Sequence, residues 1–177
     1  MTGQINDWNS MEELELSQIS STAVFITPEG YATLQQELDH LTSVKRGEIA
    51  ERLRDSKMHG EFSEDNNELD EVKFEQAIVE NRIAELKGVF AQAQVIDTDT
   101  LSVTHVGVGN YVTVRDPERK IEFKIRMVSS FEADPENDLI SDESPMGIAL
   151  MGRAVGDEVE FSAPAGKMRY QVLEISK

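Results

Sequence analysis

The 177-residue sequence contains no cysteine, which excludes a disulfide framework, a thiolate metal site and a cysteine nucleophile. No apolar run approaches the roughly 20 residues that are needed to cross a bilayer. The N-terminus lacks the basic start and the apolar stretch of a signal peptide. These absences predict a cytoplasmic protein with no membrane partner.

Motifs for catalysis are also missing. The three histidines, His40, His59 and His105, are scattered along the chain, and no spacing typical of a zinc site occurs. The sequence has no glycine-rich phosphate loop and no nucleophile elbow. We therefore expect no complete active site, so the chain is not an enzyme by itself and has no cofactor of its own.

Basic residues are scarce. The chain has 17 Lys and Arg against 34 Asp and Glu, for a net charge of −17, and neither end nor the middle is net basic. This balance argues against sequence-specific DNA binding and against binding naked duplex by counterion release. An acidic chain suits a basic protein surface, a basic channel or a cation. The alternative is that the acidity only maintains solubility.

The first long periodic segment starts after residues 1–24, which are polar and acidic and predict a disordered or weakly ordered extension. Thr27 is a suitable N-cap, and Pro28 fits the first helical position. One apolar stripe follows, with a change of phase near Lys45–Arg46 that indicates a stutter, and Gly60 is a typical end. The stripe consists of Tyr31, Leu34, Leu38, Leu41, Val44, Ile49 and Leu53.

A second helix is predicted after Asp65, which resembles a capping box together with Glu68. Its seam has alternating spacings of three and four, typical of a coiled coil. The seam consists of Leu69, Val72, Gln76, Val79, Ile83, Leu86, Phe90 and Ala93. Residues 25–97 therefore predict an antiparallel coiled-coil hairpin, with its tip at 59–67 and a length of ~45 Å.

Residues 98–177 change to a strand-like pattern. Four strands are expected, with a turn at Asp116–Glu118 between the first two and a short helix that Ser144 caps and Gly152 closes. The expected strands are Tyr111–Val114, Ile121–Val128, Glu158–Phe161 and Tyr170–Ile175. The fold class is therefore α+β, a helical hairpin followed by a small antiparallel sheet with a helix on it.

The hairpin tip gathers the carboxylates Glu61, Glu64 and Asp65 without a lysine or arginine. A projecting hairpin that ends in carboxylates can carry negative charge to a place that a globular surface cannot reach. The alternative is a solvated turn, because acidic clusters are frequent in so acidic a chain.

Four groups of residues, in this order and spacing, resemble the bacterial Gre transcript-cleavage factors of the GreA type, over roughly residues 25–176. The first is Ile26–Tyr31, and the second is His59–Glu64. The third runs from Arg82–Leu86 to Ala93–Asp97, and the last combines Glu132–Pro135, Ile140–Ser141, Ser144–Pro145, Ala149–Gly152 and Val155–Asp157.

The resemblance implies a C-terminal domain of FK506-binding-protein-like shape that docks on RNA polymerase, while the hairpin enters the secondary channel. The polymerase then cleaves the 3′ end of backtracked RNA. On this resemblance Glu61 and Glu64 are the catalytic carboxylates and share Mg²⁺ with polymerase. Arg52, Arg54, Lys57 and Lys73 are candidates for contact with the nascent RNA 3′ end, the alternative being ion pairs with Glu48, Glu51 and Asp55. The loop Glu143-Ser144-Pro145 would bind polymerase, and the protein would act as a monomer.

The tip departs from the family pattern, since Glu61 replaces the usual Asp, Leu69 replaces a Tyr, and the stretch Asp65–Asn67 is one residue longer. A Gre-like regulator that occupies the channel without cleavage is therefore an open alternative. Two other classes remain: a prolyl isomerase or chaperone, disfavoured by the few aromatics in residues 98–177, and a coiled-coil oligomerisation module that dimerises through Leu69–Ala93.

Overall fold

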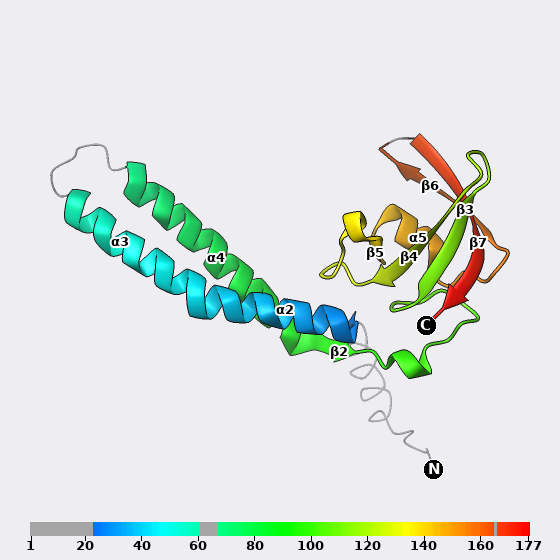
Figure 1. Ribbon diagram of the computed structural model, residues 1–177, viewed down its shortest axis with the longest axis horizontal. Helices are drawn as coiled ribbons and strands as arrows, with labels where there is room; N and C mark the ends of the chain where they lie inside the picture. Colours follow the sequence, from blue (N-terminus) through cyan, green and yellow to red (C-terminus); the bar gives the residue numbers. More distant parts are fainter. Residues whose placement is uncertain (1–22, 61–66, 165) are drawn as a thin grey trace, which may run out of the picture.

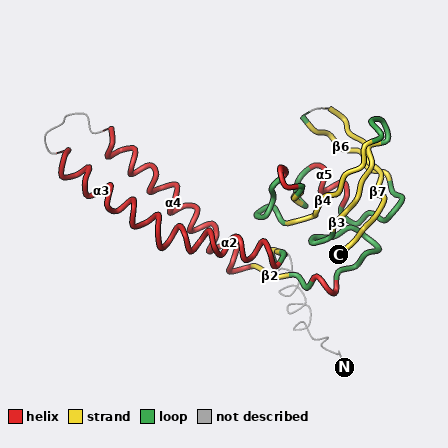
Figure 2. The backbone as a smooth tube through the Cα atoms, viewed as in Figure 1, coloured by secondary structure: helices red, strands yellow, loops and turns green. Residues whose placement is uncertain are grey.

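The structure is a computed structural model that describes residues 23–60, 67–164 and 166–177. A long helical hairpin projects from a small sheet domain, and the two parts meet at the base of the hairpin (Figure 1). Helix dominates one part and strand the other (Figure 2). The α+β class expected from the sequence is confirmed.

The first arm of the hairpin is one continuous helical rod with three segments. It comprises α2 (Pro28–His40), the π-helical turn η1 (Leu41–Lys45) and α3 (Arg46–Gly60). The expected start is confirmed, because the Thr27 Oγ1 accepts a hydrogen bond of 3.0 Å from the backbone N–H of Gly30 and Pro28 occupies the first turn. The expected end at Gly60 is also confirmed.

The π-helical turn lies at the predicted change of phase. Such a turn takes up an extra residue inside an α-helix and rotates the residues that follow it. Val44, which the sequence placed on the buried stripe, is 41% exposed, so that prediction was wrong. Half-buried Lys45 takes its place on the face that continues to buried Ile49.

The second arm is α4 (Asn67–Gln92). Its seam is confirmed at Val72, Val79, Ile83 and Leu86, which are all buried. Leu69, Phe90 and Ala93 are half-buried, but Gln76 is exposed, so its place on the seam was wrong. Val89 is buried as well, although the sequence pattern did not select it. Toward the outer end, α4 packs on Ile49 and Leu53, and toward the base it packs on Leu34. The capping residue proposed at Asp65 lies outside the described residues.

A short two-stranded parallel sheet closes the base of the hairpin. Strand β1 (Val24–Ile26) precedes the first arm, strand β2 (Ala93–Val95) follows the second, and Val24 pairs with Ala93. The sequence predicted no strand before Thr27 and assigned residue 24 to the extension, so both expectations were wrong at β1. Pairing with β2 supplies partners that a three-residue strand cannot supply alone.

The C-terminal sheet has the strand order β5-β4-β3-β7-β6. The bounds are β3 (Tyr111–Asp116), β4 (Ile121–Val128), β5 (Leu139–Ser141), β6 (Glu158–Ala163) and β7 (Gly166–Ser176). Short 3-10 turns occur at η2 (Thr98–Thr100) and η3 (Pro135–Asn137), and α5 spans Pro145–Leu150. The four expected strands are confirmed, but β5 was missed and pairs parallel to β4, so the sheet is mixed and not purely antiparallel.

Local chemistry explains two connections of this sheet. The buried Asp116 Oδ1 accepts from the backbone N–H groups of Glu118 and Arg119 at 2.9 and 3.0 Å, which closes the expected turn between β3 and β4. Gly152 follows α5 with φ of 74°, a conformation that glycine adopts without strain.

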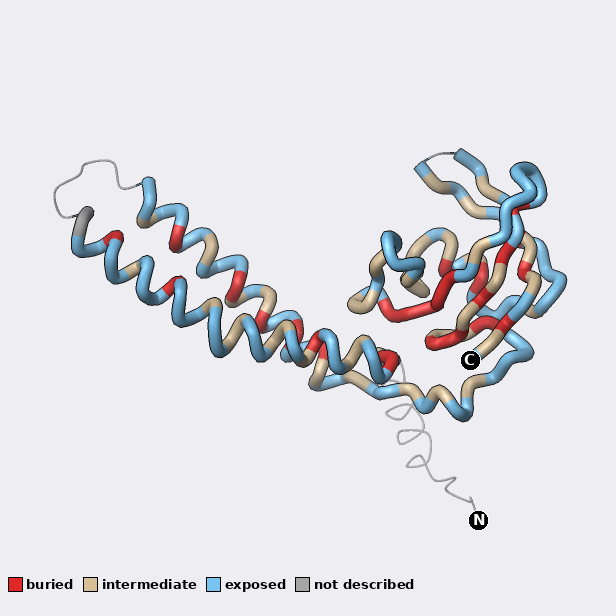
Figure 3. Tube along the Cα trace, viewed as in Figure 1, coloured by how far each residue is buried: buried red, intermediate tan, exposed pale blue. Residues whose placement is uncertain are grey.

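Buried residues are concentrated in the sheet domain and along the seam of the hairpin (Figure 3). The sheet core includes fully buried Val112, Val114, Met127, Leu150 and Val172. In the described part of the chain, no helix is both long and apolar enough to cross a membrane.

Candidate functional site

The outer end of the hairpin is formed by the last turn of α3 and the first turn of α4, farthest from the sheet domain (Figure 1). Gly60 ends α3 and Asn67 begins α4. Met58, near this end, is 69% exposed. The predicted catalytic residues Glu61 and Glu64 fall between the two helix ends in the sequence and lie outside the described residues.

The four basic candidates lie on the outer half of the hairpin and are exposed. Arg52 of α3 forms an ion pair with Glu75 of α4, and Lys73 lies 3.4 Å from Asp70. Neither partner was among those expected, since Glu48 pairs with Lys45 instead. Arg54 and Lys57 make no ion pair with any residue that the structure describes.

The predicted docking loop lies directly before α5. Ser144 caps this helix, because its Oγ accepts from the Gly147 N–H at 3.0 Å and donates to the Ser141 carbonyl at 2.7 Å. Glu143 and Pro145 are exposed on either side. The capping role expected of Ser144 is confirmed, and it leaves the two neighbouring side chains directed to solvent.

An apolar groove of about 410 Å³ runs beside this loop. Side chains from η3, β5, α5 and the end of β6 line it. They include Pro135, Ile140, Met146, Phe161 and Pro164. The sequence analysis missed this groove, because the lining residues come from four separate segments whose proximity depends on the mixed sheet.

The carboxylate of Asp142, beside the Glu143-Ser144-Pro145 loop, and that of Glu37 on the hairpin have pKa values shifted in opposite directions. Burial, with a smaller contribution from Glu143, raises the pKa of Asp142. The hydrogen bond from Arg82 lowers the pKa of Glu37 in α2. The loop therefore holds a partly buried carboxylate, whereas the hairpin pairs its carboxylate with a cation.

The residues that the structure describes contain no cluster of metal ligands. Within residues 23–60, 67–164 and 166–177, no group of three or more His, Asp or Glu side chains is placed to hold an ion. Of the three histidines, His40 and His105 are exposed. The pair Glu61 and Glu64, for which the resemblance implies a shared Mg²⁺, lies outside these ranges.

Sequence reasoning also missed the contact between the two parts. Glu132, in the loop after β4, accepts hydrogen bonds from the start of α2, 105 residues away. One local signal was available, because Gly30 stands in the first turn of a helix where alanine would be more favourable. A glycine there indicates close approach of another group.

Together these parts define a class of protein in which a projecting two-helix hairpin is carried by a small α+β domain. Comparison with known proteins narrows the class. Family models described as "Transcription elongation factor, N-terminal" and "Transcription elongation factor, GreA/GreB, C-term" match residues 24–95 and 101–177. The chain belongs to the GreA/GreB family of transcription elongation factors.

Relatives of known name are similar to this chain along most of its length. The transcription elongation factor GreA of Thermoanaerobacter pseudethanolicus is 44% identical over 157 residues, covering 89% of this chain and 99% of the relative. GreA of Acetivibrio thermocellus is 44% identical and covers 87% and 96%. Among solved structures, the GreA factor homolog 1 protein of Thermus thermophilus is 30% identical, covers 88% and 99%, and has a TM-score of 0.42.

Proposed function

We propose that this protein binds bacterial RNA polymerase in the cytoplasm, inserts its hairpin into the secondary channel, and stimulates cleavage of backtracked RNA by the polymerase active centre. The carboxylates of Glu61 and Glu64 would act on the reaction, and the sheet domain would hold the factor on the enzyme. The chain would be an accessory factor and not a nuclease by itself.

One observation supports this proposal above the others. The helix ends that flank Glu61 and Glu64 in the sequence lie at the far end of the hairpin, whereas the exposed Glu143-Ser144-Pro145 loop lies on the sheet domain. With about 1.5 Å per residue, the rod from Pro28 to Gly60 spans about 50 Å. A hairpin of that length is far longer than its own core requires, and it separates a docking surface from a reactive end.

The chemistry of the two carboxylates fits the reaction. When bound, Mg²⁺ stabilises the attacking and leaving oxygens of a phosphodiester during hydrolysis. Glu61 would contribute an oxygen ligand to an ion held jointly with polymerase. Glu64, three residues later, would support Glu61 or accept a hydrogen bond from the attacking water. A negative end also suits entry into a channel lined by basic side chains.

The remaining candidates have supporting roles in this proposal. Arg54 and Lys57, with exposed side chains that make no described ion pair, are the better placed to contact phosphates of the RNA 3′ segment. Arg52 and Lys73 would have to leave Glu75 and Asp70, at small cost because exposed ion pairs contribute about 0–1 kcal/mol. Glu143 and Pro145 would contact polymerase.

The test is transcript cleavage by backtracked elongation complexes, with polymerase from the same source and several Mg²⁺ concentrations. We expect short 3′ fragments with the wild type and a loss of at least about 100-fold in rate with Glu61→Ala plus Glu64→Ala. The matched control is Glu68→Ala plus Glu71→Ala, which removes two exposed carboxylates with the same spacing from α4. Glu143→Arg should weaken binding to polymerase and leave the rate at saturation unchanged.

The outcomes distinguish a factor that stimulates cleavage from a regulator that binds polymerase without cleavage. Fragments that disappear only with the Glu61 and Glu64 variant support the cleavage factor. Binding that slows polymerase without producing fragments would replace it with a Gre-like regulator that does not cleave. Equal losses in both double variants would mean that general acidity, and not this pair, is required.

A further inference from the structure

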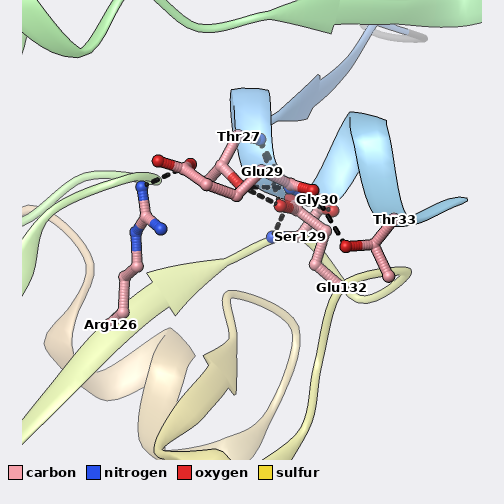
Figure 4. A network of polar contacts seen from close by, with 7 residues as sticks. All are labelled: Thr27, Glu29, Gly30, Thr33, Arg126, Ser129 and Glu132. Carbon is pink, nitrogen blue, oxygen red and sulfur yellow. Dashed lines mark hydrogen bonds and ion pairs between the residues drawn. The ribbon is translucent and has the colours of Figure 1, made fainter.

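The start of α2 is held by a carboxylate from the sheet domain (Figure 4). The backbone N–H of Thr27 donates to both oxygens of Glu132, at 3.2 and 3.1 Å, and the Thr27 hydroxyl donates to Oε2. The hydroxyl of Ser129 donates to Oε1 at 2.9 Å and so orients the carboxylate from its own side. Thr27 is 1% exposed, so these bonds are sheltered from water.

Gly30 makes this contact sterically possible. A Cβ atom on Gly30 would lie 1.8 Å from Oε2 and 2.3 Å from Cδ of Glu132, which is far inside van der Waals contact. Because these atoms end a flexible side chain, a residue larger than glycine would displace the carboxylate and would leave the helix itself intact. Glycine is therefore required here for the contact between the two parts.

Two further contacts surround the carboxylate. Arg126 of β4, whose side chain is 10% exposed, donates to Glu29 of α2 at 3.0 Å and stacks over the Tyr111 ring at 4.9 Å. Phe131 packs against the apolar cluster at the hairpin base, which contains Ile26 and Leu86. A cleft of about 280 Å³ remains beside them, so the junction is held by a few directed contacts.

The length of the hairpin makes its direction sensitive to this junction. For a rod of about 50 Å, a rotation of about 1° at the base moves the outer end by about 0.9 Å. A displacement of about 1 Å at a reacting group can cost about 100-fold in rate. When the sheet domain is docked, the outer end of the hairpin therefore reaches the reacting groups only if the angle between the hairpin and the sheet domain is fixed.

We propose that Glu132 and Gly30 are positioning residues that fix the direction of the hairpin relative to the docking domain. The carboxylate receives donors from both parts, and Gly30 admits it to the first turn of α2. Their role in cleavage rests on the proposed function above. The rigidity that they confer is a property of the free protein and can be measured separately.

The first measurement is of direction. Since the chain has no cysteine, Ala50→Cys on α3 and Glu158→Cys on β6 introduce two unique, exposed sites for spin labels. Distance distributions between the labels would be recorded for the wild type, Gly30→Ala and Gly47→Ala. Gly47 is the matched control, because it is also helical and a Cβ there meets nothing within 4 Å.

We expect a single narrow distribution for the wild type and for Gly47→Ala. Gly30→Ala should shift or broaden it, by about 3 Å for each 5° of rotation at the label position. Helix content measured by circular dichroism should be unchanged, because the carboxylate and not the helix moves. A distribution for Gly30→Ala that matches the wild type would overturn the proposal.

The second measurement separates placement from docking. In the cleavage assay, Gly30→Ala should lower the rate at saturation by about 10-fold or more, while the half-saturating concentration changes less than about 3-fold. Glu132→Ala should behave in the same way, and Glu132→Gln, which keeps one acceptor oxygen, should recover part of the rate. Loss of affinity at an unchanged maximal rate would assign these residues to docking instead and would refute a positioning role.

The two proposals fail in different ways. If the wild type releases no fragments, the proposed function fails, and the label distances still test the junction. If the wild type cleaves and the Gly30→Ala distances are altered without a change in rate, the direction of the hairpin does not limit cleavage and the positioning role is wrong. Should Gly30→Ala fail to fold, Glu132→Ala provides the same distance test.

Discussion

The outer half of the hairpin and the sheet domain bury their side chains very differently. In the sheet domain, ten buried residues from β3, β4, β6, β7, α5 and the preceding loop form one continuous core. Between Leu41 and Gln76, the described hairpin buries only Ile49, Ser56 and Val72 (Figure 3). The outer hairpin is therefore a thin structure with a single seam and solvent on all other sides.

Ion pairs take over part of the contact between the arms. Arg46 pairs with Glu80 and Arg52 with Glu75 across the seam, and Arg82 binds both oxygens of Glu37 at 2.7 and 2.8 Å. Exposed pairs of this kind contribute only about 0–1 kcal/mol each. The comparison indicates that stability resides in the sheet core and in the apolar cluster at the hairpin base, whereas the outer hairpin gains reach at the expense of stability.

The largest expected change in the free energy of unfolding comes from truncating one large core residue in the hairpin and one in the sheet domain. Leu86 is fully buried at the hairpin base and Met127 is fully buried in the sheet. Each substitution by alanine should lower the free energy of unfolding by about 2–5 kcal/mol. Hydrogen exchange should show amide protection lost mainly in α2–α4 for Leu86→Ala, and mainly in β3, β4 and β7 for Met127→Ala.

Phe74→Ala is the control for the hairpin, because Phe74 is 68% exposed and its removal should change stability little. Loss of protection spread evenly over both regions in either variant would show that they unfold as one unit. The contrast between a thin hairpin and an independent sheet core would then be wrong.

Two buried serines, one on the hairpin and one in the sheet domain, test the same comparison through smaller changes in stability. Ser56 on the hairpin is 3% exposed and its Oγ has no hydrogen-bond partner in the described structure, whereas Ser129 is 5% exposed and donates to Glu132. A buried hydroxyl without a partner is destabilising. Ser56→Ala should therefore raise the free energy of unfolding by up to about 1 kcal/mol, and Ser129→Ala should lower it by about 1 kcal/mol, as measured in urea. Changes of the same sign in the two variants would contradict this explanation.

The local patterns of the sequence were sufficient for the helices. The spacing of Val72, Val79, Ile83 and Leu86 predicts the seam of α4, and Thr27-Pro28 predicts the start of α2, since both depend on neighbours within a few residues. The sequence showed that the apolar stripe changes phase near Lys45, but it did not show which residues the change would bury. A π-helical turn rotates the following residues, so Val44 became exposed where a regular helix would bury it.

Features that depend on distant segments could not be predicted. Strand β5 has only three residues and owes its existence to parallel pairing with β4, and β1 likewise depends on β2. The bonds between Thr27 and Glu132 join positions 105 residues apart. The candidate carboxylates Glu61 and Glu64 were found from a motif, which carries information about chemistry, whereas the groove beside Ser144 required the folded chain.

The smallest expected change in stability comes from protonating single carboxylates in acid. The change has opposite signs for Glu37 on the hairpin and Asp142 in the sheet domain. The Arg82 hydrogen bond lowers the pKa of Glu37, so this carboxylate stabilises the fold above the ordinary Glu range, and the contribution is lost as pH falls through the lowered pKa. Because Glu37 is 37% exposed, Glu37→Gln should cost only about 0.5 kcal/mol at pH 7. Burial raises the pKa of Asp142, so the ionised group opposes folding at pH 7 and the penalty disappears as pH falls through the raised pKa.

Thermal unfolding from pH 7 down to pH 3 should therefore separate the two carboxylates. Glu37→Gln should melt below the wild type at pH 7 and approach it in acid, because protonation removes the same interaction from the wild type. Asp142→Asn should melt above the wild type at pH 7 and also approach it in acid, because protonation removes the buried charge from the wild type. Two curves that approach the wild type from opposite sides would show that the hairpin uses its charges for cohesion, whereas the charge of Asp142, in the loop before α5, reduces stability. Curves on the same side would remove that distinction.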